Sequence, residues 1–308
     1  MTTTGSARPL RGTTVHADDG VPLAVLEVGP ATAPLTLVFV HGHCHDTGVW
    51  TTLRDALPPT TGSPVRMVFF DHRGHGRSGG APAETYTVDQ VGRDLAAVLD
   101  AVTRGPVVLI GHSMGGMAIL SYARQHPADV GSRVVGVALI ATAADDLVRS
   151  GLGRYLHSPA VELFRRAVSR APRLTQRAVR FGGRTVLPLA RAVPRRAGKR
   201  GQGEWWLPGL LALLRSDTSV VTMAGFLRSF AALDEAAALT VLASVPALVL
   251  CGSHDEWTPF ELSTGLAARL PLAELVRVDD AGHSVIVERP AEVATALGRL
   301  CTAALELL

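Results

Sequence analysis

The stretch VVLIGHSMGG, residues 107–116, joins an apolar run to the pattern G-x-S-x-G and then to a segment with helical character. An uninterrupted apolar run of this length is typical of a strand buried on both faces of a sheet. A sharp strand-to-helix turn needs glycines two residues before and after the serine, here Gly111 and Gly115, because neighbouring backbone approaches closely there. The pattern therefore predicts that Ser113 lies exposed at a helix N-terminus, where free N–H groups and the helix dipole favour developing negative charge.

Similar apolar runs recur on both sides of this turn. They are Leu35–Val40, Val65–Phe70, Val134–Ile140, Ala247–Leu250 and Leu275–Val278, with extended patterns at Thr13–His16 and Pro22–Val28. Between them, Thr87–Gln90 is a capping box that opens a helix reaching about Val102, and Pro127 stops a second helix that starts at Met114. A last helix is predicted over Pro290–Leu305. Short buried strands that alternate with helices favour a parallel sheet covered on both faces.

The serine has candidate partners further along the chain. A serine hydroxyl needs a base to accept its proton, and the base needs a carboxylate to orient it. Asp255 and His283 each lie in a loop that directly follows a predicted strand, as Ser113 does. Because parallel strands gather their functional residues at the carboxyl edge of the sheet, the three side chains are expected to meet there.

Neighbouring residues offer alternatives to this assignment. Glu256, Asp279 and Asp280 could replace Asp255 as the acid, but Asp255 lies closest behind its strand. His112, beside the serine, is interpreted as a packing and hydrogen-bonding residue rather than as the base.

These motifs resemble those of α/β-hydrolase-fold serine hydrolases, in particular the esterases and monoacylglycerol-lipase-like enzymes. The matching stretches are His41-Gly42, Phe70–Ser78, Gly111–Gly116, Gly252–Pro259 and Gly282-His283, which span nearly the whole chain. The chain order serine, aspartate, histidine also matches that family. The resemblance implies a mostly parallel eight-stranded sheet with helices on both faces and a helical cap insertion.

The resemblance also implies roles for single residues. The backbone N–H groups of His43 and Met114 would stabilise an oxyanion, while His41, Gly42, Gly111 and Gly115 would shape the turns that carry them. Ser113 would form an acyl-enzyme with Asp255 and His283 as its partners, and neither a metal nor a cofactor is expected. The resemblance therefore implies a small-molecule acyl substrate that is cleaved at a carboxylic ester. The same three residues could instead cleave a thioester, a lactone or a C–C bond.

Residues 145–233 interrupt the strand–helix alternation and are predicted to form a helical, Arg-rich cap on a core made of residues 1–144 and 234–308. Between Arg149 and Arg200 the sequence has thirteen Arg and one Lys against a single acid, Glu162. Pro172 is expected to split one helix there, and Gly182-Gly183 to break the helical pattern. Trp205-Trp206 would form either an apolar lip of the cap or part of its core.

The basic cap allows three interpretations. Arg166, Arg170, Arg173, Arg177 and Arg180 recur at steps of three or four, as on one side of a helix. They could form a solvated face, dock on an anionic membrane surface, or attract an anionic acyl substrate. Nucleic acid is not an expected partner, because the basic residues lack interleaved aromatics and a binding motif.

The string HGHCHD, residues 41–46, suggests a different chemistry. It nearly matches the H-x-H-x-D-H ligand string of metallo-β-lactamase-fold hydrolases, so a metallohydrolase that uses the His41–His45 cluster is an alternative. The last two residues are transposed, however, and a metal site would leave Ser113, Asp255 and His283 without a role. A second alternative is a non-catalytic small-molecule-binding protein, which would be expected to lack part of the triad.

The composition sets the remaining limits. The 308 residues are 47% hydrophobic with a net charge of +3, which is typical of a globular protein with a large core. Three widely spaced cysteines suggest no disulfide framework, and the start of the chain lacks the apolar segment of a signal peptide. The protein is therefore expected to be cytoplasmic; the sequence leaves the oligomeric state open.

Overall fold

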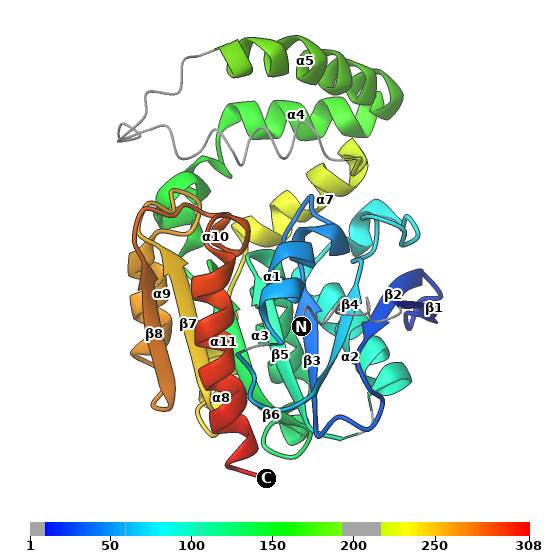
Figure 1. Ribbon diagram of the computed structural model, residues 1–308. Helices are drawn as coiled ribbons and strands as arrows, with labels where there is room; N and C mark the ends of the chain where they lie inside the picture. The colour runs from blue at the N-terminus through cyan, green and yellow to red at the C-terminus, as the bar shows by residue number, and fades with distance from the viewer. Residues whose placement is uncertain (1–9, 59, 104, 193–216) are drawn as a thin grey trace.

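The computed structural model describes residues 10–58, 60–103, 105–192 and 217–308 (Figure 1). The predicted eight-stranded sheet is confirmed, with the strand order β1-β2-β4-β3-β5-β6-β7-β8. β2 pairs antiparallel with β1 and with β4, and the other neighbours pair in parallel. The strands are β1 Arg11–His16, β2 Pro22–Val28, β3 Leu35–Val40, β4 Val65–Phe70, β5 Val107–His112, β6 Val134–Ile140, β7 Ala247–Gly252 and β8 Ala273–Val278.

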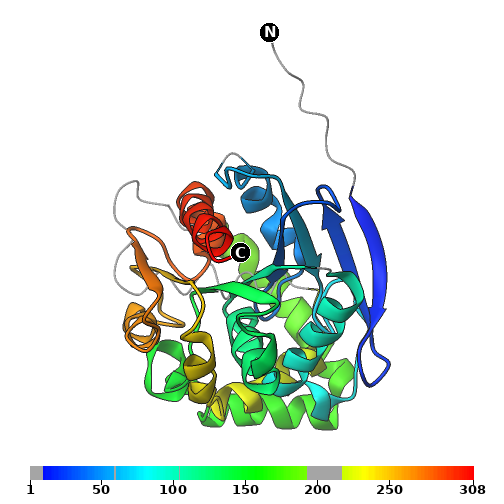
Figure 2. The same ribbon diagram turned by 90° about the horizontal axis from the view of Figure 1, so that it is seen from below.

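Helices cover both faces of the sheet, as Figure 2 shows in the view along the strands. α1 (Thr51–Ala56), α10 (Val285–Glu288) and α11 (Pro290–Leu305) pack on one face. α2 (Val88–Val102), α3 (Met114–Gln125), α8 (Ala236–Leu242) and α9 (Phe260–Ala267) pack on the other. Each face of the sheet therefore has its own apolar core, which explains why β3, β5 and β6 are buried along their whole length.

Two strands are longer than the apolar runs that predicted them: β8 starts earlier and β5 ends later. β8 begins at Ala273, two residues before the predicted start, because the ladder to β7 includes Ala273 and the exposed Glu274. β8 is an edge strand, so its first residues need not be apolar to pair. β5 extends to His112, since Gly111 and His112 continue the ladder with β6.

A helical region is inserted between β6 and β7, above the carboxyl edge of the sheet (Figure 1). Its described helices are α4 (Pro159–Arg170), α5 (Pro172–Ala192) and α7 (Val220–Ala231). Pro172 separates α4 from α5 as predicted, but the expected break at Gly182-Gly183 is wrong, since α5 continues through both glycines. Trp205-Trp206 lies outside the described residues. The described helices include none that is both long and apolar enough to cross a membrane.

The first turn of α3 packs directly on the end of β3. A Cβ atom built on Gly115 would lie 1.9 Å from the carbonyl oxygen of Val40, and one built on Gly111 would lie 2.6 Å from the backbone of Gly115. Both distances are far below van der Waals contact, so only glycine fits at these positions. Gly131 and Gly265, by contrast, have nothing within 4 Å of such an atom.

Replacing Gly115 by alanine should therefore destabilise the protein by at least about 3 kcal/mol, since the new methyl group overlaps backbone that cannot move independently. Gly265→Ala is the matched control, because Gly265 is also helical but faces open space. It should stabilise the protein by about 0.5–1 kcal/mol through helix propensity. Urea unfolding of both variants measures the difference. A Gly115→Ala variant within about 1 kcal/mol of the wild type would contradict the packing argument.

Candidate active site

Ser113 lies in the turn between β5 and α3 with an unusual backbone conformation, φ 55° and ψ −119°. Its N–H donates to the carbonyl of Ile140 at 2.9 Å, and Thr142 Oγ1 donates to its carbonyl at 2.7 Å. Such a conformation costs energy in a non-glycine residue and persists only when its surroundings enforce it. Here the bonds to β6 and to the residues after it enforce the turn and hold Oγ at the sheet edge.

The structure brings together the three residues that follow β5, β7 and β8. Ser113 Oγ lies 2.9 Å from His283 Nε2, and Asp255 Oδ2 lies 2.8 Å from His283 Nδ1. Because the aspartate can only accept when ionised, Nδ1 carries the proton and Nε2 is left to accept from the serine hydroxyl. The carboxylate of Asp255 is fully buried, and His283 is mostly buried. This arrangement can transfer a proton from the serine to the imidazole.

Asp255 is held by more bonds than the sequence indicated. The backbone N–H groups of Trp257 and Thr258 donate to Oδ1 at 2.9 Å each, and Thr258 Oγ1 donates to Oδ2 at 2.8 Å. These bonds fix the carboxylate plane so that one oxygen faces His283. The signal was present in the aspartate itself, whose side chain commonly bonds the backbone two residues on.

His112 holds the loop that carries His283. Its Nε2–H donates to the carbonyl of His283 at 2.8 Å, and its ring is completely buried. This agrees with its interpretation as a hydrogen-bonding residue. The link joins the residue before the serine to the histidine loop, so neither can shift alone.

His43 and Met114 line the same cavity as Ser113, and within the described residues neither the His43 nor the Met114 N–H has a hydrogen-bond acceptor. Met114 is the first residue of α3, where backbone N–H groups have no partner within the helix. Two unpaired donors beside a serine can stabilise a negatively charged oxygen.

Histidines fix the loop that carries the His43 N–H. His41 Nδ1–H donates to the carbonyl of Gly42 at 2.8 Å, and His41 Nε2 accepts from the His72 N–H at 3.1 Å. His72 Nε2–H in turn donates to the carbonyl of His41 at 3.0 Å. The turn at His41-Gly42 is thus tied to the loop after β4 by reciprocal bonds.

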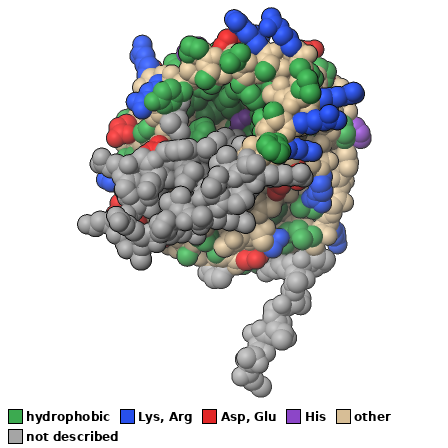
Figure 3. Space-filling model, turned by 90° about the horizontal axis from the view of Figure 1, so that it is seen from above, with side chains coloured by type: hydrophobic (Ala, Val, Ile, Leu, Met, Phe, Trp, Pro, Cys, Tyr) green, Lys and Arg blue, Asp and Glu red, His purple; other side chains and the backbone are tan. Residues whose placement is uncertain are grey.

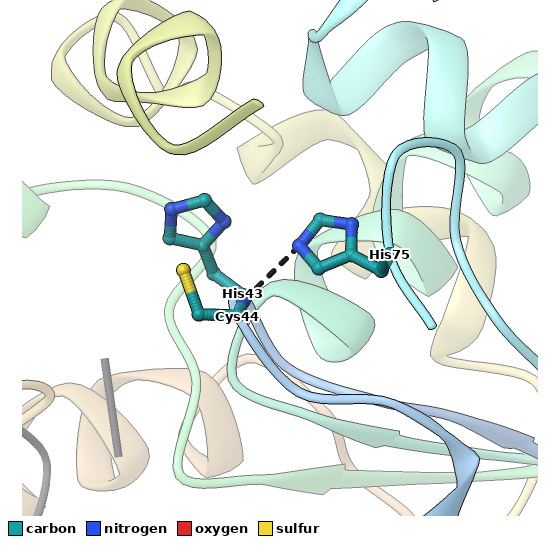
Figure 4. A group of neighbouring side chains, drawn as sticks. All are labelled: His43, Cys44 and His75. Carbon is teal, nitrogen blue, oxygen red and sulfur yellow. Dashed lines mark hydrogen bonds between the residues drawn. The ribbon is translucent and has the colours of Figure 1, made fainter. Parts of the chain in front are cut away.

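His75 ties the next residue of the same loop. Its Nδ1–H donates to the carbonyl of Arg73 at 2.9 Å, and its Nε2 accepts from the Cys44 N–H at 3.1 Å (Figure 4). Cys44 has a positive φ of 61°, so this bond supports a strained position. Asp71 adds a further tie by accepting from the Thr47 N–H at 2.7 Å. The loop therefore depends on neutral imidazoles that accept as well as donate.

Burial keeps these imidazoles neutral, because desolvation disfavours the charged form. It lowers the pKa of His41 and of His75 to about 3, and the pKa of His45 to about 4. The neighbouring histidines whose pKa burial also lowers well below the usual value are His43, His72 and His112. The cluster therefore carries no charge at neutral pH.

The residues that could hold a metal differ from those of the sequence alternative. In the described part of the chain, His43, Cys44 and His75 form the group whose ligand atoms lie within 4.8 Å of one another, and Figure 4 shows their side chains close together. His41, His45 and Asp46 do not join it; Asp46 Oδ1 instead accepts from the Gly48 N–H at 2.7 Å. A metal would also have to displace the Cys44 N–H from His75 and deprotonate a thiol whose pKa burial raises. The group fits hydrogen bonding better than metal binding.

The cavity above Ser113 has a volume of about 480 Å³ and a largely apolar wall. Its floor carries Ser113, Met114 and His283, and Met117 of α3 lies beside them. Helices of the inserted region form the roof, with these apolar side chains: Val161, Phe164, Val179, Met223, Leu227 and Phe230. No acidic or basic side chain other than histidine lines the cavity among the described residues.

Comparison with known proteins matches residues 36–290 to the alpha/beta hydrolase fold family. The chain is 25% identical to the AB hydrolase superfamily protein YisY of Bacillus subtilis, covering 91% of this chain and 95% of that protein. The chain is 28% identical to a putative carbamate hydrolase RutD of Caulobacter segnis, covering 73% of this chain and 76% of that protein. It spans 42% of the length of a putative 2-succinyl-6-hydroxy-2,4-cyclohexadiene-1-carboxylate synthase of Bacillus subtilis.

Solved structures show the same fold. A thermophilic esterase from Thermogutta terrifontis aligns with a TM-score of 0.69 at 24% identity, over 96% of this chain and 99% of that one. The enol-lactonase from Burkholderia xenovorans LB400 aligns with a TM-score of 0.68 at 25% identity, over 94% of this chain and 100% of that one. At such identities the fold is shared, and the reaction has to be argued from the site.

The buried neutral histidines predict a steep loss of stability in mild acid. In the unfolded chain each would titrate near its ordinary pKa of about 6.5, so stability is full above that pH and falls as the unfolded state takes up protons below it. For His45, with a folded pKa of about 4, the loss between neutral pH and pH ~5 amounts to about 2 kcal/mol.

His45→Gln should remove that contribution, so its free energy of unfolding should fall by about 2 kcal/mol less than that of the wild type over the same pH interval. His16→Gln is the matched control, since His16 is exposed, and it should follow the wild type. Urea unfolding at the two pH values measures both. Equal pH dependence in all three proteins would show that His45 is not held neutral by burial.

Proposed function

The chain belongs to the alpha/beta hydrolase fold family, and on that premise we propose that it is a serine hydrolase that cleaves carboxylic esters through an acyl-enzyme on Ser113. The observation that carries the proposal is the chain of hydrogen bonds from Ser113 Oγ through His283 to Asp255 at the floor of an apolar cavity. A serine that held only a structural role would not need a buried imidazole and a buried carboxylate in line with it.

In the first step His283 Nε2 takes the proton of Ser113 as Oγ attacks the ester carbonyl carbon. Asp255 holds the Nδ1 tautomer and stabilises the imidazolium that forms. The imidazolium then gives the proton to the departing alkoxide, which leaves as an alcohol. In the second step His283 removes a proton from water as the water oxygen attacks the acyl carbon. The bond from that carbon to Ser113 Oγ then breaks, the imidazolium returns its proton to Oγ, and the carboxylic acid leaves.

Both steps pass through a tetrahedral intermediate with a negatively charged oxygen. The backbone N–H groups of His43 and Met114 are proposed to donate to it, supported by the absence of other acceptors for them in the described structure. Removing one such donor typically costs about 3–4 kcal/mol of transition-state stabilisation. The ties from His41, His72 and His75 would keep the His43 donor in place before substrate binds.

The cavity wall supports an apolar acyl group as the substrate part that binds above Ser113. Each buried methylene contributes about 0.8 kcal/mol, so the apolar roof favours medium-length acyl chains over acetyl. The absence of Lys and Arg from the described wall speaks against an anionic group inside the cavity. Lactones, thioesters and C–C bonds are alternative substrates for the same three residues.

The proposal predicts that Ser113→Ala abolishes both ester hydrolysis and labelling by a fluorophosphonate probe, since the probe forms its bond with an activated serine. Asp255→Asn should lower kcat by roughly 10⁴, because the imidazole would hold the wrong tautomer. Ser132→Ala, an exposed serine, is the control and should behave as the wild type. Activity should also survive a chelator. Loss of activity in the chelator, or no labelling of the intact protein, would refute the proposed mechanism.

A second prediction concerns acyl length. Leu227→Trp enlarges a side chain in the cavity roof and should lower kcat/KM for an octanoyl ester by at least about tenfold, while an acetyl ester changes little. Leu227→Met, which conserves volume, should keep the wild-type preference. Steady-state kinetics with p-nitrophenyl esters of both lengths provide the measurement. An equal loss on both esters would mean that the acyl group does not occupy this part of the cavity.

A further inference from the structure

The outer sides of α4 and α5 form a basic surface, which we call the basic face: Arg166 and Arg170 of α4 with Arg173, Arg177 and Arg180 of α5. All five side chains are exposed. Glu162 pairs with Arg166 at 2.9 Å and with Arg165 at 3.0 Å. Among the described residues no acid pairs with the other four arginines of the basic face. The surface therefore has an unbalanced positive charge, which a solvated face does not require.

Large apolar side chains are exposed among these arginines. Leu163 of α4 is 69% exposed and Leu174 of α5 is 66% exposed. Phe181, seven residues after Leu174 and hence on the same side of α5, is 70% exposed. Single exposed apolar residues are common on proteins, but here three lie on the two helices that also carry the basic face.

The opposite sides of the same helices roof the cavity over Ser113. Val161 and Phe164 of α4 and Val179 of α5 line it. Figure 3, seen from above, shows a hollow lined by hydrophobic side chains with a histidine inside and basic side chains along its rim. The basic face and the cavity thus lie on opposite sides of the same two helices.

We propose that the basic face docks on an anionic phospholipid surface. Arginines at such a surface contribute about 1 kcal/mol each through attraction to the lipid phosphates. Exposed leucines beside them enter the boundary between headgroups and acyl chains, as on interfacial amphipathic helices. A nucleic acid or an acidic protein would satisfy the arginines but would leave Leu163 and Leu174 without an apolar environment, so the combination favours lipid. If the proposed ester hydrolysis also holds, the substrate would be an acyl lipid of that surface; only this statement about the substrate rests on the proposed function.

Sedimentation of the full chain with vesicles tests the docking. Vesicles of phosphatidylcholine with phosphatidylglycerol should bind the protein at low salt, and phosphatidylcholine alone should bind at least about tenfold more weakly. High salt should weaken the binding to the anionic vesicles, because the charges are screened. Equal binding to both kinds of vesicle, or none to either, would overturn the proposal.

Two matched triple variants distinguish binding through the basic face from binding through the net charge of the whole protein. The triple variant Arg173→Gln, Arg177→Gln and Arg180→Gln should weaken binding to anionic vesicles by roughly 100-fold. The control, Arg93→Gln, Arg277→Gln and Arg299→Gln, removes the same charge from exposed arginines elsewhere and should change binding by less than about threefold. If the two triple variants lost vesicle binding equally, net charge would explain the binding and the proposed docking through the basic face would be refuted. Circular dichroism melting checks that all variants remain folded.

The apolar contribution has its own test. Leu163→Ser with Leu174→Ser should weaken vesicle binding but leave binding to a soluble polyanion, such as heparin, unchanged. Undiminished vesicle binding in this variant would show that the leucines do not enter the lipid, and would overturn the argument that favours a membrane over a soluble polyanion. Ser113→Ala should bind vesicles as the wild type does. Vesicle binding therefore tests the docking inference alone, whereas ester hydrolysis tests the proposed function, and the failure of one can be told from the failure of the other.

Discussion

The contact between the first turn of α3 and the end of β3 governs the geometry of the site. Gly115 lies against the carbonyl of Val40 with no room for a side chain, and Gly111 lies too close to the backbone of Gly115 to carry one. This approach brings α3 beside the turn at His41-Gly42, so that Ser113, Met114 and His43 line one cavity. Any separation of α3 from β3 would move Met114 away from His43. The strained backbone of Ser113 is a consequence of this packing, held by bonds to β6 and beyond.

A second constraint is that the surroundings of this contact must be uncharged. The loops after β3 and β4 are joined by imidazoles that donate with one nitrogen and accept with the other, which only the neutral form can do. Burial enforces neutrality and excludes water, so each bond is strong but the loops become sensitive to acid. The same burial works against metal binding at Cys44, whose thiol is held protonated. Residues of the string that resembles a ligand set thus take part in the hydrogen bonds that hold the loop after β3.

The inserted helices have two sides with different chemistry. Their inner residues roof an apolar cavity, whereas their outer residues combine arginine with exposed leucine. Burial of Val168 between the helices holds the two sides in fixed relation. The edge of the sheet therefore carries Ser113 and His283, and the inserted helices cover the cavity above them.

Local sequence determined the sheet, because buried strands and capped helices have periods that short windows reveal. It also determined the order of Ser113, Asp255 and His283 and their places directly after β5, β7 and β8, since a parallel sheet sends every such loop to one edge. The tertiary structure alone decided which histidines pair: His41 with His72, His75 with Cys44, and His112 with the His283 loop. Those partners lie about thirty to more than a hundred residues apart, as the bonds record, and no local pattern encodes such contacts. The tertiary structure also decided that α5 continues through Gly182, because contacts with neighbouring helices outweigh the low helix propensity of glycine. It decided that Leu174 is exposed, because the core surface available to α5 limits which of its apolar residues can be buried.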